Sequence, residues 1–184
     1  MEDVTDMTSN FPITTLQRFF SGITEQTFQT QFGVADNTLI DYVSDLLIRF
    51  VRYDALFKIR TLKGRPVSEI GEMMVEADAR IGNARREVHR HIGDFALFWT
   101  GLYPEALRPR TQSEIDRFID YCLHGKRAYH IASTIETDEE EAAPCEVLVR
   151  LSDQFEMCAY GLREVRREWE RRDDDDTPLP FLIN

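Results

Sequence analysis

The sequence is organised around residues 83–104, NARREVHRHIGDFALFWTGLYP, where helix start and stop signals agree with the spacing of the apolar residues. At about 100 degrees per residue, a helix gathers its apolar side chains into one stripe: Val88, Ile92, Phe95, Trp99 and Leu102. Arg86 and Arg90 fall on the opposite side. From Phe95 to Trp99 the helix is apolar all round, so other helices or a partner should enclose it. We therefore predict a core helix that ends at Pro104.

Helical signals also occur in most of the remaining chain. Segments with helical periodicity or capping residues are 24–33, 36–57, 69–82, 113–136 and 146–172, and Thr24 and Asp36 are the expected N-caps of the first two. A two-stranded ribbon through Phe57, Ile59 and Thr61 is conceivable, but its strands would be too short to stand alone. The 184 residues fit one ordinary domain. The prediction is an all-α, single-domain irregular bundle of five or six helices.

The segment 146–172 has the most regular pattern, because its apolar residues alternate spacings of three and four. They are Leu148, Leu151, Phe155, Cys158, Leu162, Val165 and Trp169. Such a stripe is typical of a coiled-coil seam or of a long bundle helix. We expect one helix packed along the 83–104 helix, with an antiparallel homodimer as the competing interpretation. Within 113–136, Gly125 indicates either close helix approach or a kink.

The two ends of the chain differ from its centre in composition. Residues 1–15 are polar and predict a flexible N-terminal arm, with the helical domain covering 16–172. Four acids, Asp173 to Asp176, should unravel the last helix because they lie at its negative end. The tail 173–184, acidic and then apolar, is expected to be disordered or to dock its apolar end into a groove.

Charge and cysteine content limit the function classes. The formal net charge of −11 disfavours binding to nucleic acid and gives no attraction to anionic membranes. No apolar run approaches the roughly 18 residues that a membrane span needs, and the acidic start lacks the features of a secretory signal. Cys122, Cys145 and Cys158 are widely spaced, which favours reduced structural thiols. These features predict a cytoplasmic protein without a membrane partner.

The best candidate for metal binding lies within the 83–104 helix. Glu87, His91 and Asp94 share about 60 degrees of arc and could form half of a divalent-metal site, assisted by His124 or His130. His89 and His91 point apart and cannot chelate one ion. The alternative interpretation is a row of ion pairs, Glu87 with His91 and Asp94 with an arginine of a neighbouring helix. We assign no metal and no cofactor.

Basic residues give the stronger lead. There is no nucleophile elbow, glycine-rich phosphate loop or cysteine in a catalytic setting, so no catalytic residue is assigned and an enzyme is not favoured. If the loop after Phe57 lies near the start of the 83–104 helix, two basic patches merge into a surface for an acidic partner. Its candidate residues are Lys58, Arg60, Lys63, Arg65, Arg85, Arg86 and Arg90.

Three segments, EVHRHIGDFALFWTGLYPE, IDYCLHGKRAYHIAS and LSDQFEMCAYGLREVRREWE, resemble a group of uncharacterised bacterial proteins. The resemblance covers roughly residues 36–172 and implies an all-helical fold and a bacterial, cytoplasmic origin. It implies no activity, cofactor or catalytic residue.

Together these observations favour a non-enzymatic helical protein that binds a protein partner or a second copy of itself, as a scaffold or adaptor module. The alternative is a metal- or small-ligand-binding helical protein, possibly an enzyme, that uses Glu87, His91 and Asp94.

Overall fold

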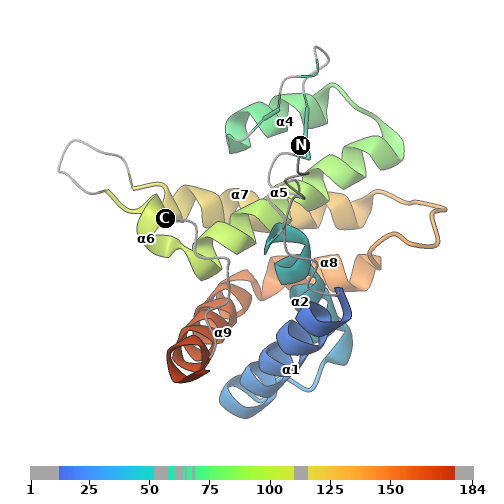
Figure 1. Cartoon of the computed structure of the whole chain (residues 1–184). Coiled ribbons are helices and arrows are strands. Elements are labelled where there is room, and N and C mark those ends of the chain that lie inside the picture. The colour runs from blue at the N-terminus through green and yellow to red at the C-terminus, as the bar shows by residue number, and fades with distance from the viewer. Residues whose placement is uncertain are drawn as a thin grey trace, which may run out of the picture.

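The computed structural model describes residues 13–51, 58–60, 64, 66–67, 69–109 and 116–176, which form a helical bundle (Figure 1). Its helices are α1 (Ile13–Phe32), α2 (Asn37–Val51), α4 (Ile70–Asp78), α5 (Gly82–Leu102), α6 (Pro104–Leu107), α7 (Phe118–Thr134), α8 (Cys145–Asp153) and α9 (Phe155–Asp176). Outside them, the described residues contain one isolated antiparallel bridge, between Arg60 and Pro66. The all-α prediction is confirmed. The predicted count of five or six helices is wrong, because the described part alone contains eight.

Helix α5 lies at the centre of the bundle. It passes diagonally through the middle of Figure 1, with α4 above it and α1 and α9 below, and it packs against α4, α7 and α9. Phe95, Ala96, Leu97 and Phe98 are buried, and Trp99 is half-buried. The apolar run is therefore enclosed by helices of the same chain. One hydrophobic cluster extends from α1 to α9.

The stripe of residues 148–169 is buried throughout, and each of its seven side chains is at most 9% exposed. The prediction of one continuous helix is wrong. At Gln154 the backbone leaves helical geometry (φ −110°, ψ 25°), and α8 and α9 continue separately on either side. The stripe stays buried because α8 packs on α7, while α9 packs on α1 and α5. Its apolar pattern thus serves the fold of a single chain.

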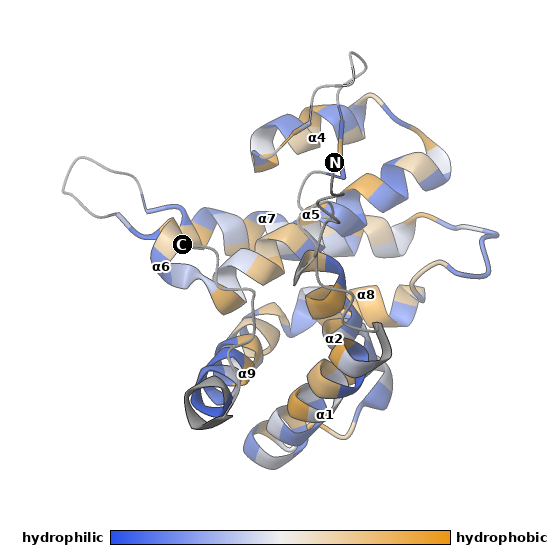
Figure 2. Ribbon diagram, in the orientation of Figure 1, coloured by the Kyte–Doolittle hydropathy of each residue, from blue (hydrophilic) through white to orange (hydrophobic). Residues whose placement is uncertain are grey.

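The first described helix begins earlier than predicted. Thr24 was expected to cap a helix, but it lies fully buried inside α1, which starts at Ile13. One side of α1 packs into the core through Phe20, Ile23 and Phe28. Figure 2 shows the apolar residues along α1. Residues 1–12 of the predicted arm lie outside the described residues.

The start of α2 agrees with its capping signal. The Leu39 amide donates to Asp36 Oδ1 at 3.2 Å, which confirms Asp36 as the cap of α2. Residues 52–57, the predicted end of that helix, lie outside the described residues, as do Ser68, 110–115 and 177–184. At the other end of the chain, α9 continues to Asp176 although the acidic run was expected to end it near Arg172. Charges at a helix end typically contribute under about 1 kcal/mol each, which is too little to set the boundary alone.

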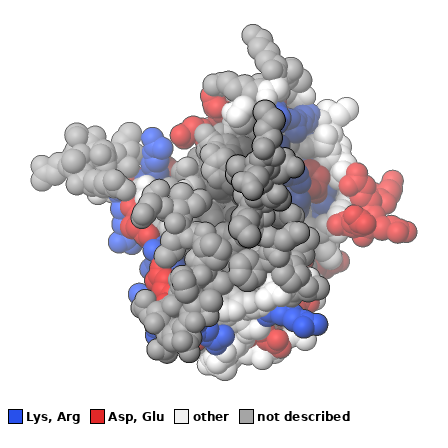
Figure 3. Space-filling model, viewed as in Figure 1, with Lys and Arg blue, Asp and Glu red and all other residues white. Residues whose placement is uncertain are grey.

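Surface properties follow from this packing. Acidic side chains gather over the loop between α7 and α8, at the right-hand edge of Figure 3. The three cysteines are free thiols, and burial raises the pKa of Cys158 to about 12. None of the described helices combines the length and apolar character that crossing a bilayer requires.

Gly125 marks a close approach of helices, and α7 runs through it without a break. A Cβ atom there would lie 2.5 Å from the Phe155 ring and 2.8 Å from Ala96 Cβ. These neighbours belong to α9 and α5, so the missing side chain lets three helices meet.

Replacing Gly125 by alanine should therefore lower the free energy of unfolding by about 1–3 kcal/mol through overpacking. Gly22→Ala is the matched control, because a Cβ on this exposed α1 residue meets nothing within 4 Å. It should be neutral or stabilising by up to about 1 kcal/mol. Urea denaturation followed by circular dichroism measures both, and equal effects of the two substitutions would contradict the packing described.

Candidate functional site

Asp94 lies in the middle of α5, where α5 meets α7. The preceding residue, Gly93, leaves room for a ring, since a Cβ there would lie 2.6 Å from Tyr129 Cδ1. Tyr129 of α7 can therefore pack flat against α5 and bring its hydroxyl to the Asp94 carboxylate. Asp94 is completely buried, and its surroundings must supply its hydrogen bonds.

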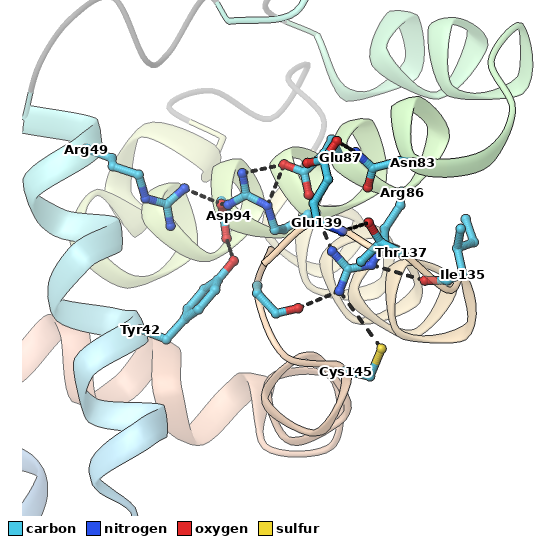
Figure 4. Close-up of polar contacts among 12 residues, drawn as sticks. Tyr42, Arg49, Asn83, Arg86, Glu87, Asp94, Ile135, Thr137, Glu139 and Cys145 are labelled. Carbon is cyan, nitrogen blue, oxygen red and sulfur yellow. Dashed lines mark hydrogen bonds and ion pairs between the residues drawn. The ribbon is translucent and has the colours of Figure 1, made fainter. Parts of the chain in front are cut away.

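Four donors from three helices surround the Asp94 carboxylate, and Figure 4 shows two of them, Tyr42 and Arg49. The hydroxyls of Tyr42 and Tyr129 donate to Oδ1 at 2.7 and 2.8 Å. Arg49 and Arg90 donate to Oδ2 at 2.8 and 3.0 Å. The alternative interpretation from the sequence, in which Asp94 pairs with an arginine of a neighbouring helix, is confirmed by Arg49 of α2.

The charges of this cluster keep Asp94 ionised. Burial alone would raise the pKa of Asp94, but the charges of Arg49 and Arg90 and the hydrogen bond from Tyr42 bring it below its usual value. Burial and the adjacent carboxylate raise the pKa of Tyr42 and of Tyr129. The phenols therefore stay protonated and act as donors over the physiological range.

Arg90 and Arg86 extend the cluster along α5. Arg90 Nη2 lies 2.7 Å from Glu87 Oε2, and Arg86 Nη1 lies 3.4 Å from Glu87 Oε1. The Arg86 side chain is fully buried, and it donates to the carbonyl oxygens of Ile135 and Ala143. Arg86 thereby fixes both ends of the loop between α7 and α8 to α5.

The structure corrects the placement of two arginines predicted to face a partner. Arg86 was placed on the side opposite the buried stripe, but the loop 135–144 covers that side. The Arg90 side chain is only 12% exposed, and its guanidinium is bonded to Glu87 and Asp94. Neither residue is free to bind another molecule.

Glu87, His91 and Asp94 do not form a metal site in this fold. Asp94 accepts four hydrogen bonds, and Glu87 pairs with Arg90 instead of the predicted His91. The His91 ring stacks on Phe50, with centroids 5.6 Å apart and an interplanar angle of 21°. Across the described segments, no group of three histidine, cysteine, aspartate or glutamate side chains could hold a metal ion.

The remaining basic candidates lie between α2 and α5. Lys58 and Arg60 are exposed, while Lys63 and Arg65 lie outside the described residues. Desolvation by its surroundings and the charge of Arg90 lower the pKa of Lys58. Arg80 Nη2 donates to the Arg60 carbonyl oxygen at 3.1 Å, so the loop does approach the α4–α5 turn.

Arg85, the last candidate, lines a pocket between α4, α5 and α7. The pocket also contains His89 of α5 together with His124 and Arg127 of α7, and its volume is about 100 Å³. Its members lie four apart on α5 and three apart on α7, spacings that place side chains on one helix face. The sequence does not reveal which helix faces meet, so their convergence was not predicted. His130 lies outside this pocket and is exposed.

Comparison with known proteins adds no assignment: no protein-family model, curated protein or solved structure matches this chain.

The buried imidazole of His91 should make stability depend on pH. Burial lowers the pKa of His91 to about 4, with Lys58 and Arg90 adding to the effect and Asp94 opposing it. An unfolded histidine has a pKa of about 6.5. The unfolded chain then binds more protons between these values, so stability present above pH 6.5 is lost as the pH falls toward 4.

Wild type should lose up to about 1.4 kcal/mol of unfolding free energy per pH unit below pH 6 through this group. His91→Phe, which keeps a ring on Phe50, should flatten this slope, and His130→Gln at an exposed site should not. Urea denaturation of each protein at pH 7.0, 6.0 and 5.0 measures this dependence of the unfolding free energy on pH. An unchanged slope in His91→Phe would show that His91 is not the group responsible.

Proposed function

We propose that this chain is a non-enzymatic, protein-binding helical module that acts as a scaffold or adaptor. Exposed apolar side chains on two neighbouring helices carry the proposal. On α7, Ile119 is 64% and Leu123 is 60% exposed, and on α4, Val75 is 68% exposed. Large apolar residues at such exposure cost little singly, but a group of them favours contact with another protein.

Two of these residues are sequence neighbours of residues that line the pocket between α4, α5 and α7. Leu123 precedes the pocket residue His124 and lies one helical turn from Arg127, while Val75 follows Met74, which also lines the pocket. A hydrophobic rim around a positively charged depression resembles the centre of many protein interfaces, where apolar contact and arginine occur together. We call Val75, Ile119 and Leu123 the α4–α7 rim.

The polar interior supports binding rather than chemistry. The strongest titratable cluster consists of Asp94, two tyrosines and two arginines, and its members bond to one another. A general acid or base must reach the reacting group within hydrogen-bond distance. Asp94 is 0% exposed and accepts four hydrogen bonds, so it is placed to hold helices together.

The partner in this proposal is another protein or a second copy of the chain. The net charge of −11 and the acidic loop after α7 favour a protein over nucleic acid. We further propose a bacterial, cytoplasmic setting, which is supported by the three free thiols and by the resemblance described above. The alternative of a metal site at Glu87, His91 and Asp94 gains no support from their geometry.

Leu123→Asp should abolish partner binding, because it places a charge in the apolar rim. Val149→Asp on α8 is the control, since Val149 is also exposed (40%) but lies on a helix that does not line the pocket. Quantitative affinity capture from extracts of the source organism compares both variants with wild type. If the partner is a second copy of the chain, light scattering of the purified wild type and the two variants shows which of them form a dimer.

The proposal is supported if Val149→Asp still captures a partner protein, or still dimerises, and Leu123→Asp does not. If no association differs between the two variants, the α4–α7 rim is not a binding surface.

A further inference from the structure

The pocket beside the α4–α7 rim has the composition of an anion site. Arg85 and His89 enter it from α5, and His124 and Arg127 enter it from α7. The apolar part of its lining comes from Met74, Ile92, Ala128 and Ile131, and Asp78 is the one carboxylate among the described residues that line it. The volume of about 100 Å³ is sufficient for one small ionic group.

His89 is the most informative member of this pocket. Its side chain is 4% exposed, and among the described residues its Nε2 has no hydrogen-bond partner. Arg85 Nε is likewise buried and unpartnered within the described segments. A buried donor or acceptor without a partner typically costs about 1–3 kcal/mol, so a molecule in this pocket that hydrogen-bonds to both residues would recover that free energy.

The charge balance determines what kind of molecule this is. Two guanidinium groups face one carboxylate, Asp78, whose side chain is 75% exposed and lies 3.5 Å from Arg85 Nη2. In the described part of the chain, Arg127 takes part in no ion pair or hydrogen bond. The pocket is therefore locally positive on a protein whose net charge is −11.

We propose that this pocket binds a small oxyanion, a phosphate or carboxylate group, through Arg85, Arg127 and the imidazole of His89. Guanidinium groups recognise such anions with directed, charge-assisted hydrogen bonds, and the apolar lining strengthens those bonds by limiting water. The anion is either a free small molecule or an acidic group of a docked protein. Only the second source rests on the proposed protein-binding function.

His89 gives the site a pH dependence. Burial lowers the pKa of His89, the charges of Arg85 and Arg127 lower it further, and Asp78 raises it. His124 faces the same pocket from α7. A bound anion favours the imidazolium form, so binding takes up a proton and becomes tighter as the pH falls.

Sulfate is the most direct probe, because it is an oxyanion that does not change its charge between pH 5.5 and 8. Titration of the full chain, followed by NMR of the histidine side chains, should show saturable sulfate binding with the largest shifts at His89. Chloride at matched ionic strength should not reproduce those shifts. Binding should be tighter at pH 6.0 than at pH 7.5.

Arg127→Gln should weaken sulfate binding by about tenfold, the loss expected for one charge-assisted hydrogen bond. Arg127 is exposed, so this substitution should leave the fold intact. Arg18→Gln on α1 is the control for the loss of one positive charge, because Arg18 is exposed and lies outside the pocket. Equal weakening by both variants, or shifts no larger than those in chloride, would overturn the proposal.

The source of the anion is tested by adding sulfate to the capture experiment. If sulfate releases a protein that depends on Leu123, the docked protein supplies the anionic group. If sulfate binds but leaves that protein in place, the ligand is a free small anion. Saturable sulfate binding without any Leu123-dependent protein would leave the pocket established and the proposed protein-binding function rejected.

Discussion

The buried carboxylate of Asp94 is the interaction on which the arrangement of the bundle depends. Removing an ionised carboxylate from water costs several kcal/mol unless charges and hydrogen bonds replace its hydration. Here Arg49 and Tyr42 supply them from α2, Tyr129 supplies one from α7, and Arg90 belongs to α5 itself. Apolar packing alone would tolerate many helix orientations. The four donors reach Asp94 together only when α2, α5 and α7 have the relative positions and orientations seen in the structure.

That requirement separates the groups that hold the fold from those that can bind other molecules. The donors around Asp94 are committed to it, and Arg86 is committed to the carbonyl oxygens of the α7–α8 loop. The pocket on the other side of α5 differs, because His89 Nε2 and Arg85 Nε have no partner among the described residues. On this one helix, the charged side chains of Asp94, Arg90 and Arg86 are bonded within the protein. His89 and Arg85 instead keep unpartnered atoms in residues that line the pocket, and we propose function there.

The sequence predicted those features that depend on one helix at a time. The stripe of 148–169, the enclosed run around Phe95 and the cap at Asp36 follow from local periodicity and capping, and the structure contains them. The break at Gln154 was not predictable, because apolar residues continue with the same spacing across it. Arg86 was misplaced for a related reason: a helical projection shows which residues share a face, but not which loop covers that face. The pocket depends on the meeting of α5 with α7, about which the spacing of either helix contains no information.

The free energy of unfolding of Asp94→Asn tests the central claim most directly. Asparagine keeps the shape of the side chain but removes the negative charge that pairs with Arg49 and Arg90. The substitution should lower the unfolding free energy by about 3–5 kcal/mol, the usual cost of breaking a buried ion pair. Asp45→Asn, at an exposed position on α2, should change it by less than about 0.5 kcal/mol. If Asp94→Asn is as stable as Asp45→Asn, the carboxylate does not organise the bundle and apolar packing alone sets its geometry.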